Sequence, residues 1–156
     1  MKINLIAVGR KLPAWINSGY EEYAKRLTGE CDLKLLEIAA VKRSNSVSPA
    51  KIKSIEAERI RKQIPAGSYV IALDENGKSC TTRALSEKFS GWLADGRNVT
   101  FIIGGADGLD DSLIEQSDEV LSLSELTLPH GLARILVAEQ LYRAFSILKN
   151  HPYHRE

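Results

Sequence analysis

The chain of 156 residues has little of what marks several specialised protein classes: it contains two cysteines, one methionine, three histidines and 6% aromatic residues. Cys31 and Cys80 form neither a metal-binding spacing nor a redox motif. Reduced thiols in a cytosolic core are therefore expected, with a single disulfide open as the alternative. The chain also lacks any apolar run near the ~20 residues that a membrane-spanning helix requires, so no membrane partner is expected.

The N-terminal segment MKINLIAVGRKLP lacks the features of a secretory signal peptide. Its apolar run is short, and no small-residue cleavage site follows it. We expect a first β-strand here and a cytoplasmic protein. With 44% hydrophobic and 26% charged residues, the composition is typical of a soluble globular protein, and the length predicts a single domain over residues 1–156.

Basic residues are missing from one long stretch, although the net charge is only +1. Between Arg97 and Arg134 there is no lysine or arginine. The acidic residues in that stretch are Asp107, Asp110, Asp111, Glu115, Asp118, Glu119 and Glu125. Residues 1–97 instead carry 17 Lys and Arg residues against 11 Asp and Glu residues. The basic part could contact nucleic acid, which the acidic part would repel, or both could be ordinary solvated surface.

Strand and helix patterns alternate along the chain. Strands are predicted at residues 3–9, 33–39, 68–74, 98–104 and 119–124, and helices at about 13–27, 48–64, 82–94, 109–116 and 131–148. Ser48 followed by Pro49 is typical of a helix start, and Gly96 is typical of a helix end. The alternation predicts the α/β class with a mainly parallel sheet, and no repeat or linker divides the chain.

The predicted last helix is apolar over most of its circumference. Its apolar residues are Leu132, Ile135, Leu136, Val137, Ala138, Leu141, Tyr142, Ala144, Phe145, Ile147 and Leu148. One face of a sheet can bury only one side of such a helix. A second copy of the chain could bury the rest, which predicts a homodimer, while deep burial within one chain is the alternative. Glu139 and Arg143 are spaced to form an i,i+4 ion pair on this helix.

The segment FIIGGADGL, residues 101–109, is a glycine-rich turn after a predicted strand. Its glycines do not match the dinucleotide-binding G-x-G-x-x-G motif, and the lysine of a P-loop is missing. A polyphosphate would also meet Asp107, Asp110 and Asp111 with no basic residue nearby in the sequence. Close backbone approach suits a neutral or cationic nucleoside instead, such as S-adenosylmethionine. A tight turn with positive φ angles is the alternative.

A second segment, LSLSELTLPHGLAR, follows the last predicted strand. Pro129 disfavours a helical conformation at Leu128. Residues 123–128 are therefore expected to be extended and to offer free backbone groups beside Gly104, which could bind an adenine. A plain strand-to-helix loop explains the same spacing.

The C-terminal segment NHPYHRE concentrates functional side chains where chain ends usually carry few. Histidine, tyrosine and arginine suit base stacking, phosphate binding and proton transfer. A docked tail with satisfied polar groups is the alternative. His130, His151 and His154 match the ligand spacing of a zinc site poorly, so no metal is expected.

Four segments together resemble one known family: INLIAVGRKLPAWINSGYEEYAKR, IIGGADGL, LSLSELTLPHGLARILVAEQLYRA and NHPYHRE. It is the RlmH family of bacterial large-subunit ribosomal RNA pseudouridine-N3-methyltransferases, which belong to the SPOUT class. The resemblance spans nearly the whole chain and is weakest over residues 41–65. It implies a SPOUT-type α/β knot, in which a C-terminal trefoil knot forms the cofactor site, and it implies a homodimer. Knots are rare, so no periodicity pattern would predict one.

The resemblance also implies site residues and the cofactor S-adenosylmethionine, with no metal. The implied cofactor-binding residues are Leu73, Gly104, Leu123, Ser124, Glu125, Leu126, Thr127 and Leu128. The tail residues Tyr153, His154 and Arg155 would complete the catalytic region across the dimer. In the family, Pro-Glu often stands where this chain has Ala106-Asp107, and alanine can stand where it has Glu125. Both changes should leave a backbone-lined pocket intact.

The mechanism expected from this resemblance is methylation of N3 of a pseudouridine in 23S ribosomal RNA within the assembled ribosome. His154 would accept the N3 proton, because a histidine can accept a proton near neutral pH. Arg155 would hold an RNA phosphate or stabilise charge on a base oxygen, and Tyr153 would stack or orient. The residues expected to contact RNA are Arg10, Lys11, Lys42, Arg43, Lys51, Lys53, Arg59, Arg61 and Lys62.

Two other functions compete with a methyltransferase. A non-catalytic ribosome-associated module that binds a nucleoside as a sensor is the main alternative. A nucleotide hydrolase is disfavoured because the chain lacks the P-loop lysine.

Overall fold

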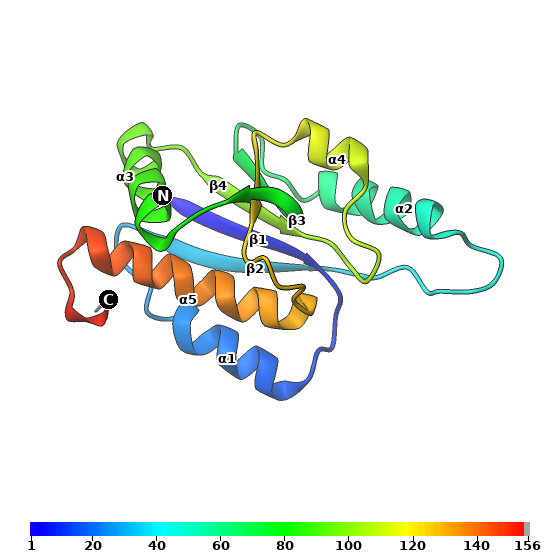
Figure 1. The fold of residues 1–156 in the computed structure, drawn as a ribbon, viewed down its shortest axis with the longest axis horizontal. Helices are drawn as coiled ribbons and strands as arrows, with labels where there is room; N and C mark the ends of the chain where they lie inside the picture. Colours follow the sequence, from blue (N-terminus) through cyan, green and yellow to red (C-terminus); the bar gives the residue numbers. More distant parts are fainter. Residues whose placement is uncertain (155–156) are drawn as a thin grey trace.

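The computed structural model of the chain describes residues 1–154, so the role expected for Arg155 lies outside the described residues. Strands and helices alternate as β1 (Lys2–Val8), α1 (Ala14–Ala24), β2 (Asp32–Ile38), α2 (Pro49–Arg61), β3 (Tyr69–Ser79), α3 (Thr82–Asp95), β4 (Val99–Ile103), α4 (Asp111–Gln116), β5 (Glu119–Ser122), α5 (His130–Leu148) and a short 3₁₀ helix η1 (Pro152–His154). The strands form one sheet in the order β2-β1-β4-β3-β5, with every neighbouring pair parallel (Figure 1). The predicted α/β class with a mainly parallel sheet is confirmed.

Helices cover both faces of the sheet, and each face has its own apolar core. Leu5 of β1 belongs to the core shared with α1, α3 and α5, whereas its neighbour Ile6 belongs to the core shared with α2 and α4. Successive side chains of a strand point to opposite faces. Both faces of β1 are therefore buried, which accounts for its nearly continuous apolar sequence.

The ends of two helices follow the capping signals in the sequence. The Ser48 side chain accepts a hydrogen bond from the Lys51 backbone N–H at 3.1 Å, and Pro49 is the first residue of α2. Gly96 ends α3 in the left-handed conformation, with a φ of 64°. Both predicted boundaries are confirmed.

The predicted end of the third strand, at Asp74, was wrong because β3 continues to Ser79. The pairing of β3 with β5 is interrupted between Leu73 and Lys78, so the intervening residues form an arch. At the end of this arch the backbone of Gly77 lies against the backbone of Leu121 in β5. Only glycine fits there without a shift, because a Cβ atom would lie 2.6 Å from the Leu121 carbonyl carbon. The arch matters for function because it lies at the carboxyl end of the sheet.

The last helix α5 packs beside α1 and α3 on one face of the sheet (Figure 1). Val137, Ala138 and Leu141 are buried, whereas Leu132 is 38% exposed and Leu136 is 36% exposed. Burial within one chain thus accounts for most of the apolar surface of this helix, and the two leucines remain for a partner. The homodimer stays a prediction.

Neither cysteine forms a disulfide within the described chain. Cys31 is buried, and this burial raises the pKa of its thiol to about 12. Cys80 is half-buried, and burial also raises the pKa of its thiol. Reduced, unreactive thiols are therefore the state that the fold favours.

Candidate functional site

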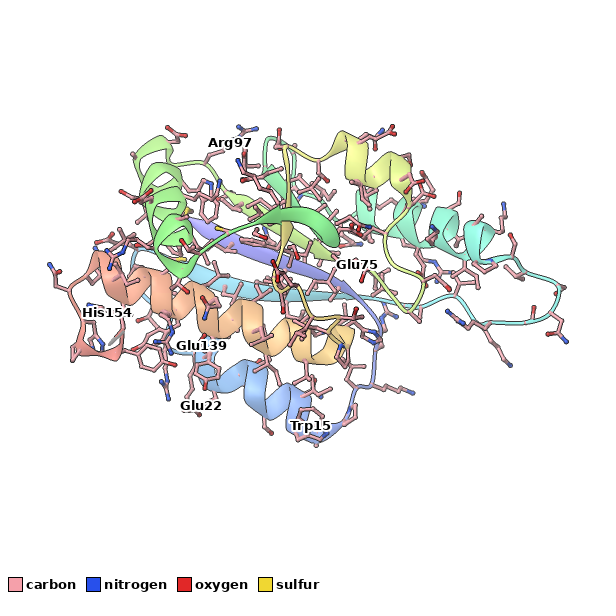
Figure 2. The ribbon with its side chains drawn as sticks, in the orientation of Figure 1. Trp15, Glu22, Glu75, Arg97, Glu139 and His154 are labelled. Atoms are coloured by element: carbon pink, nitrogen blue, oxygen red, sulfur yellow. The ribbon has the colours of Figure 1, made fainter. Side chains whose placement is uncertain are left out.

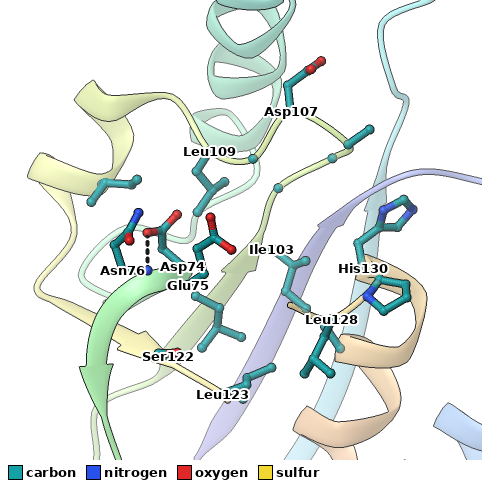
Figure 3. A pocket seen from close by; sticks show the side chains of 18 of the residues that line it. Asp74, Glu75, Asn76, Ile103, Asp107, Leu109, Ser122, Leu123, Leu128 and His130 are labelled. Carbon is teal, nitrogen blue, oxygen red and sulfur yellow. Dashed lines mark hydrogen bonds between the residues drawn. The ribbon is translucent and has the colours of Figure 1, made fainter. Parts of the chain in front are cut away.

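A cavity of about 570 Å³ opens at the carboxyl ends of β3, β4 and β5 (Figure 3). In open parallel sheets, ligands generally bind outside the carboxyl ends of the strands. The cavity is lined by the glycine turn after β4, the arch of β3 and the loop between β5 and α5. Six of the predicted cofactor-binding residues line it: Leu73, Gly104, Leu123, Ser124, Leu126 and Leu128. Glu125 and Thr127 are not among the lining residues.

The glycine turn folds back on itself at the cavity wall. A Cβ atom on Gly104 would lie 2.5 Å from the Gly108 carbonyl carbon, so no other residue fits there without moving the backbone. Gly105 and Gly108 form an antiparallel bridge, and Gly108 has a φ of 82°. The alternative of a tight turn with positive φ angles is therefore confirmed at Gly108, whereas Gly104 and Gly105 have no positive φ. The same turn also presents its backbone to the cavity, so the turn and a ligand-binding role are compatible.

The arch of β3 contributes residues that the sequence analysis missed. Asp74, Glu75 and Asn76 line the cavity, and the Asp74 carboxylate accepts a hydrogen bond from the Asn76 N–H at 2.9 Å (Figure 3). Thr127 donates to Glu75 at 3.4 Å, which links the β5–α5 loop to the arch. A polar run directly after a buried parallel strand was the available signal, because that position lies at the ligand-binding edge.

The β5–α5 loop is held mainly by its own serines. Ser122 donates to the Ser124 carbonyl oxygen at 2.9 Å, and the Ser124 hydroxyl accepts from the Leu126 N–H at 2.9 Å. Leu126 is 75% exposed and Leu123 is 38% exposed beside the cavity. The loop thus brings apolar side chains and short main-chain segments to one wall.

The acidic residues of the glycine turn have partners that are distant in the sequence. Asp107 forms an ion pair with Arg43 at 2.5 Å, and Lys53 of α2 also lines the cavity. No basic residue is near these acids in the sequence, as stated above, but in the fold the β2–α2 loop brings the Arg43 cation to Asp107. Asp110 caps α4 by accepting from the Ser112 N–H at 3.0 Å, and hydrogen bonds from Ser112 lower the pKa of its carboxyl group.

The C-terminal residues lie at the other end of the molecule from the cavity. The 19 residues of α5 begin at His130, which lines the cavity, and η1 follows the far end of the helix. A helix of this length spans about 28 Å. Figure 2 shows His154 beyond that far end and Glu75 at the arch. One chain therefore does not bring Tyr153 and His154 to the residues that line the cavity.

Tyr153 is docked in its own chain rather than free. Its ring lies 4.6 Å from the ring of Tyr142, and its hydroxyl donates to Glu139 at 3.1 Å. Burial raises the pKa of Tyr153 to about 12, and the Glu139 carboxylate adds to this effect. His154 Nδ1 is buried without a hydrogen-bond partner within residues 1–154. The Glu139–Arg143 ion pair predicted from their spacing is confirmed at 2.7 Å.

His130 is a further cavity residue that sequence reasoning treated only as a weak zinc ligand. It begins α5 directly after Pro129, at the carboxyl edge of the sheet. His151 and His154 lie beyond the other end of the same helix. No group of three potential metal ligands occurs in the part of the chain that the structure describes. Likewise, none of its helices is both long and apolar enough to span a membrane.

Comparisons with known proteins place the chain in a family. The family model described as predicted SPOUT methyltransferase matches residues 1–154. The chain is 52% identical to the ribosomal RNA large subunit methyltransferase H of Hydrogenovibrio crunogenus, over 100% of both chains. It is 50% identical to the protein of the same name from Ralstonia pickettii, over 99% of both chains.

Solved structures share the fold at much lower identity. A probable methylase family protein from Haemophilus influenzae Rd KW20 matches with a TM-score of 0.57 and 16% identity, over 99% of this chain and 70% of that one. A probable methyltransferase from Bordetella pertussis Tohama I matches with a TM-score of 0.58 and 15% identity, over 91% and 95%. The chain belongs to the SPOUT methyltransferase family and, within it, to the RlmH group of these full-length relatives.

Proposed function

We propose that this protein is an S-adenosylmethionine-dependent methyltransferase that methylates N3 of a pseudouridine in 23S ribosomal RNA. It would act in the cytoplasm as a homodimer on the assembled ribosome. The observation that carries the proposal is the identity of about half of all residues, over the full length, with relatives named ribosomal RNA large subunit methyltransferase H. The cavity at the carboxyl edge of the sheet supports it independently, because it has the size and lining of a nucleoside site.

The residues around the cavity fit S-adenosylmethionine. Gly104 lets the turn fold back onto the Gly108 backbone, which a Cβ atom would prevent, and this turn lines the cavity with main-chain groups that could read a base. Leu73 and Leu128 offer apolar contacts to an adenine ring, while Asp74 and Glu75 could attract the positive charges of the ligand. When bound, this cofactor supplies a methyl group on a cationic sulfur that is already a good leaving group. No metal is needed for such a transfer.

The position of the tail supports an active site shared between two copies. The tail of one chain lies at the end of α5 remote from its own cavity, so it can complete only the cavity of another copy. Exposed apolar side chains offer a surface for that contact: Trp15, Leu123, Leu126, Leu132 and Leu136. A homodimer that buries these residues joins each cavity to the partner's tail.

Within this shared site the tail residues have distinct roles. His154 accepts the proton that leaves N3 of the base, which frees the nitrogen lone pair for bond formation. Tyr153 orients the tail, since its hydroxyl is bound to Glu139 and its ring is packed on Tyr142. Arg155 would hold a phosphate or stabilise charge on a base oxygen. Alignment of the reacting atoms supplies most of the acceleration and is worth several kcal/mol.

The RNA surface would surround α2 and the loops beside the cavity. Lys53 lines the cavity, and Arg43 lies at its rim through Asp107. Arg59 and Arg61 instead make hydrogen bonds within the chain, Arg59 to the Ala39 carbonyl oxygen at 2.8 Å. The net charge of only +1 predicts weak binding to naked RNA, and the shaped surface of a ribosome would supply the missing affinity. Binding should weaken as salt is added.

A methyl-transfer assay tests the proposal. Purified protein, ribosomes that lack the modification and S-adenosylmethionine with a radiolabelled methyl group should yield label at a single pseudouridine of 23S RNA. The alternative, a non-catalytic nucleoside-binding module on the ribosome, would bind the cofactor and transfer nothing. Absence of transfer to ribosomes, with cofactor bound, would therefore reject the enzyme and favour that module.

A further inference from the structure

Arg26 joins the C-terminal turn to two helices through aromatic contacts. It lies just after α1, and its guanidinium carbon is 5.3 Å from the ring centroid of Tyr23, 5.5 Å from that of Tyr142 and 5.7 Å from that of Tyr153. These rings belong to α1, α5 and η1. A guanidinium group binds aromatic faces by cation–π attraction and stacking. One side chain therefore contacts all three elements.

An ion pair with Glu22 of α1 holds the Arg26 side chain in place. Its Nη2 atom donates to Glu22 at 2.6 Å, an i,i+4 ion pair along α1. Two hydrogen bonds from Lys25 and Arg26 hold the Glu22 carboxylate and lower its pKa. The cation that faces the tyrosine rings is thus held at a defined place rather than left free to rotate.

Tyr153 also has contacts with two residues of α5, Arg143 and Glu139. The Arg143 guanidinium lies 4.9 Å from the Tyr153 ring centroid. Glu139 accepts hydrogen bonds on one oxygen atom from the Tyr153 hydroxyl at 3.1 Å and from Arg143 Nε at 2.8 Å. The Tyr153 N–H donates to His151 Nδ1 at 3.3 Å within the turn itself. Tyr153 is therefore held by two cations and by the Glu139 carboxylate, and this fixes the place from which the next residue, His154, extends.

We infer that Arg26 is a positioning residue for methyl transfer, which holds Tyr153 so that His154 of one copy points toward the cavity of the other. This inference rests on the proposed function, in which His154 acts in the partner's site. Arg26 is not among the residues that line the cavity. Loss of alignment lowers turnover with little effect on cofactor binding, because the bound cofactor contacts other residues.

The kinetic test replaces the cation by a neutral side chain of similar length. In Arg26→Gln, we expect kcat for methyl transfer to ribosomes to fall about tenfold, with the Kd for S-adenosylmethionine within about twofold of wild type. Arg26→Lys should recover part of the loss, since it keeps the charge but not the planar group. Arg97→Gln is the matched control, because the Arg97 guanidinium carbon lies at a comparable 5.4 Å from the ring centroid of Tyr69, away from the C-terminal turn, and its loss should leave kcat unchanged. An unchanged kcat in Arg26→Gln, or a rise in KM alone, overturns the inference.

A second readout does not depend on activity. Tyrosine labelled with ¹³C at Cζ reports the ionisation of each phenol by NMR, and Tyr153→Phe assigns the signal. Burial holds the Tyr153 phenol un-ionised in the wild-type chain until its pKa of about 12. In Arg26→Gln a ring released into solvent should ionise at a lower pKa than in the wild type, because lost burial outweighs the loss of the nearby cation, which alone would raise the pKa. An unchanged titration overturns the inference. A wild-type protein that transfers no methyl group instead rejects the proposed function, while this titration still tests the contact.

Discussion

At Gly104 the addition of a single Cβ atom would disturb the turn that lines the cavity. A Cβ atom there would lie 2.5 Å from the Gly108 carbonyl carbon and 2.7 Å from its oxygen, and both are backbone atoms. Gly104→Ala must therefore move the turn that lines the cavity. We expect a loss of about 1–3 kcal/mol in the free energy of unfolding, as for overpacked sites, together with weaker cofactor binding. Urea denaturation and calorimetry with S-adenosylmethionine measure the two effects.

Gly91 provides the control for this substitution. It lies within α3, and a Cβ atom there would meet no heavy atom within 4 Å. Alanine is the better helix former, so Gly91→Ala should stabilise the fold by about 0.5–1 kcal/mol and leave cofactor binding unchanged. Equal effects of the two substitutions would show that the turn at Gly104 tolerates a side chain.

His154 carries the proposed proton transfer, so its removal should separate chemistry from binding. Loss of a general base typically costs a factor of about 100 or more in turnover. We expect such a fall in kcat for His154→Ala, with the Kd for S-adenosylmethionine near that of wild type, because the cavity lies at the other end of its own chain. His154→Gln keeps hydrogen bonding but cannot take the proton, and should be as slow. Turnover that survives in both variants would exclude this histidine as the base.

At the scale of helices and strands, the sequence predicts those features that depend on neighbouring residues alone, such as helix caps. Ser48 is an example, since a serine before a proline favours a helix start whatever its tertiary surroundings. The end of β3 could not be predicted in this way. Asp74 to Gly77 resemble a polar turn, and the strand continues because Lys78 pairs with Leu121 and Ser79 with Ser122. Pairing partners that are distant in sequence are not visible in a periodicity pattern.

The cap of α2 is a testable element. Ser48 accepts the Lys51 N–H at 3.1 Å, and this donor would lose its partner in Ser48→Ala. We expect a cost of about 1 kcal/mol in the free energy of unfolding, measured by urea denaturation. Ser46, whose hydroxyl lies 2.9 Å from the Ser44 hydroxyl in the same loop and caps no helix, is the control. Ser46→Ala should change the stability by less than about 0.5 kcal/mol. A cost for both, or for neither, would argue against the cap.

At the scale of the whole molecule, the sequence predicted which segments line the cavity, but it did not predict the contacts between segments that are distant along the chain. The glycine turn and the β5–α5 loop do line one cavity, as expected from their residues. The Arg43–Asp107 ion pair joins residues 64 positions apart, so no local pattern contained it. Membership of the SPOUT class implies the C-terminal trefoil knot, which arises from the path of the whole chain and leaves no periodic trace in the sequence.

The separation of cavity and tail by the length of α5 leads to a prediction about pairs of chains. If each active site combines the cavity of one copy with the tail of the other, two inactive variants should complement each other. A chain with Gly104→Ala keeps its tail, and a chain with His154→Ala keeps its cavity. In the mixed dimer, one of the two sites then receives both intact parts, whereas the other receives neither.

Random exchange of subunits gives mixed dimers for about half of the population, so about a quarter of the wild-type number of sites should be active. We expect methyl transfer to rise to that level when the two variants are unfolded and refolded together, and to stay near zero when they are refolded separately and assayed at once. Leu128→Glu offers a second cavity variant if Gly104→Ala does not refold. An active site contained in one chain predicts no recovery, because every chain in the mixture then carries a defect in its own site.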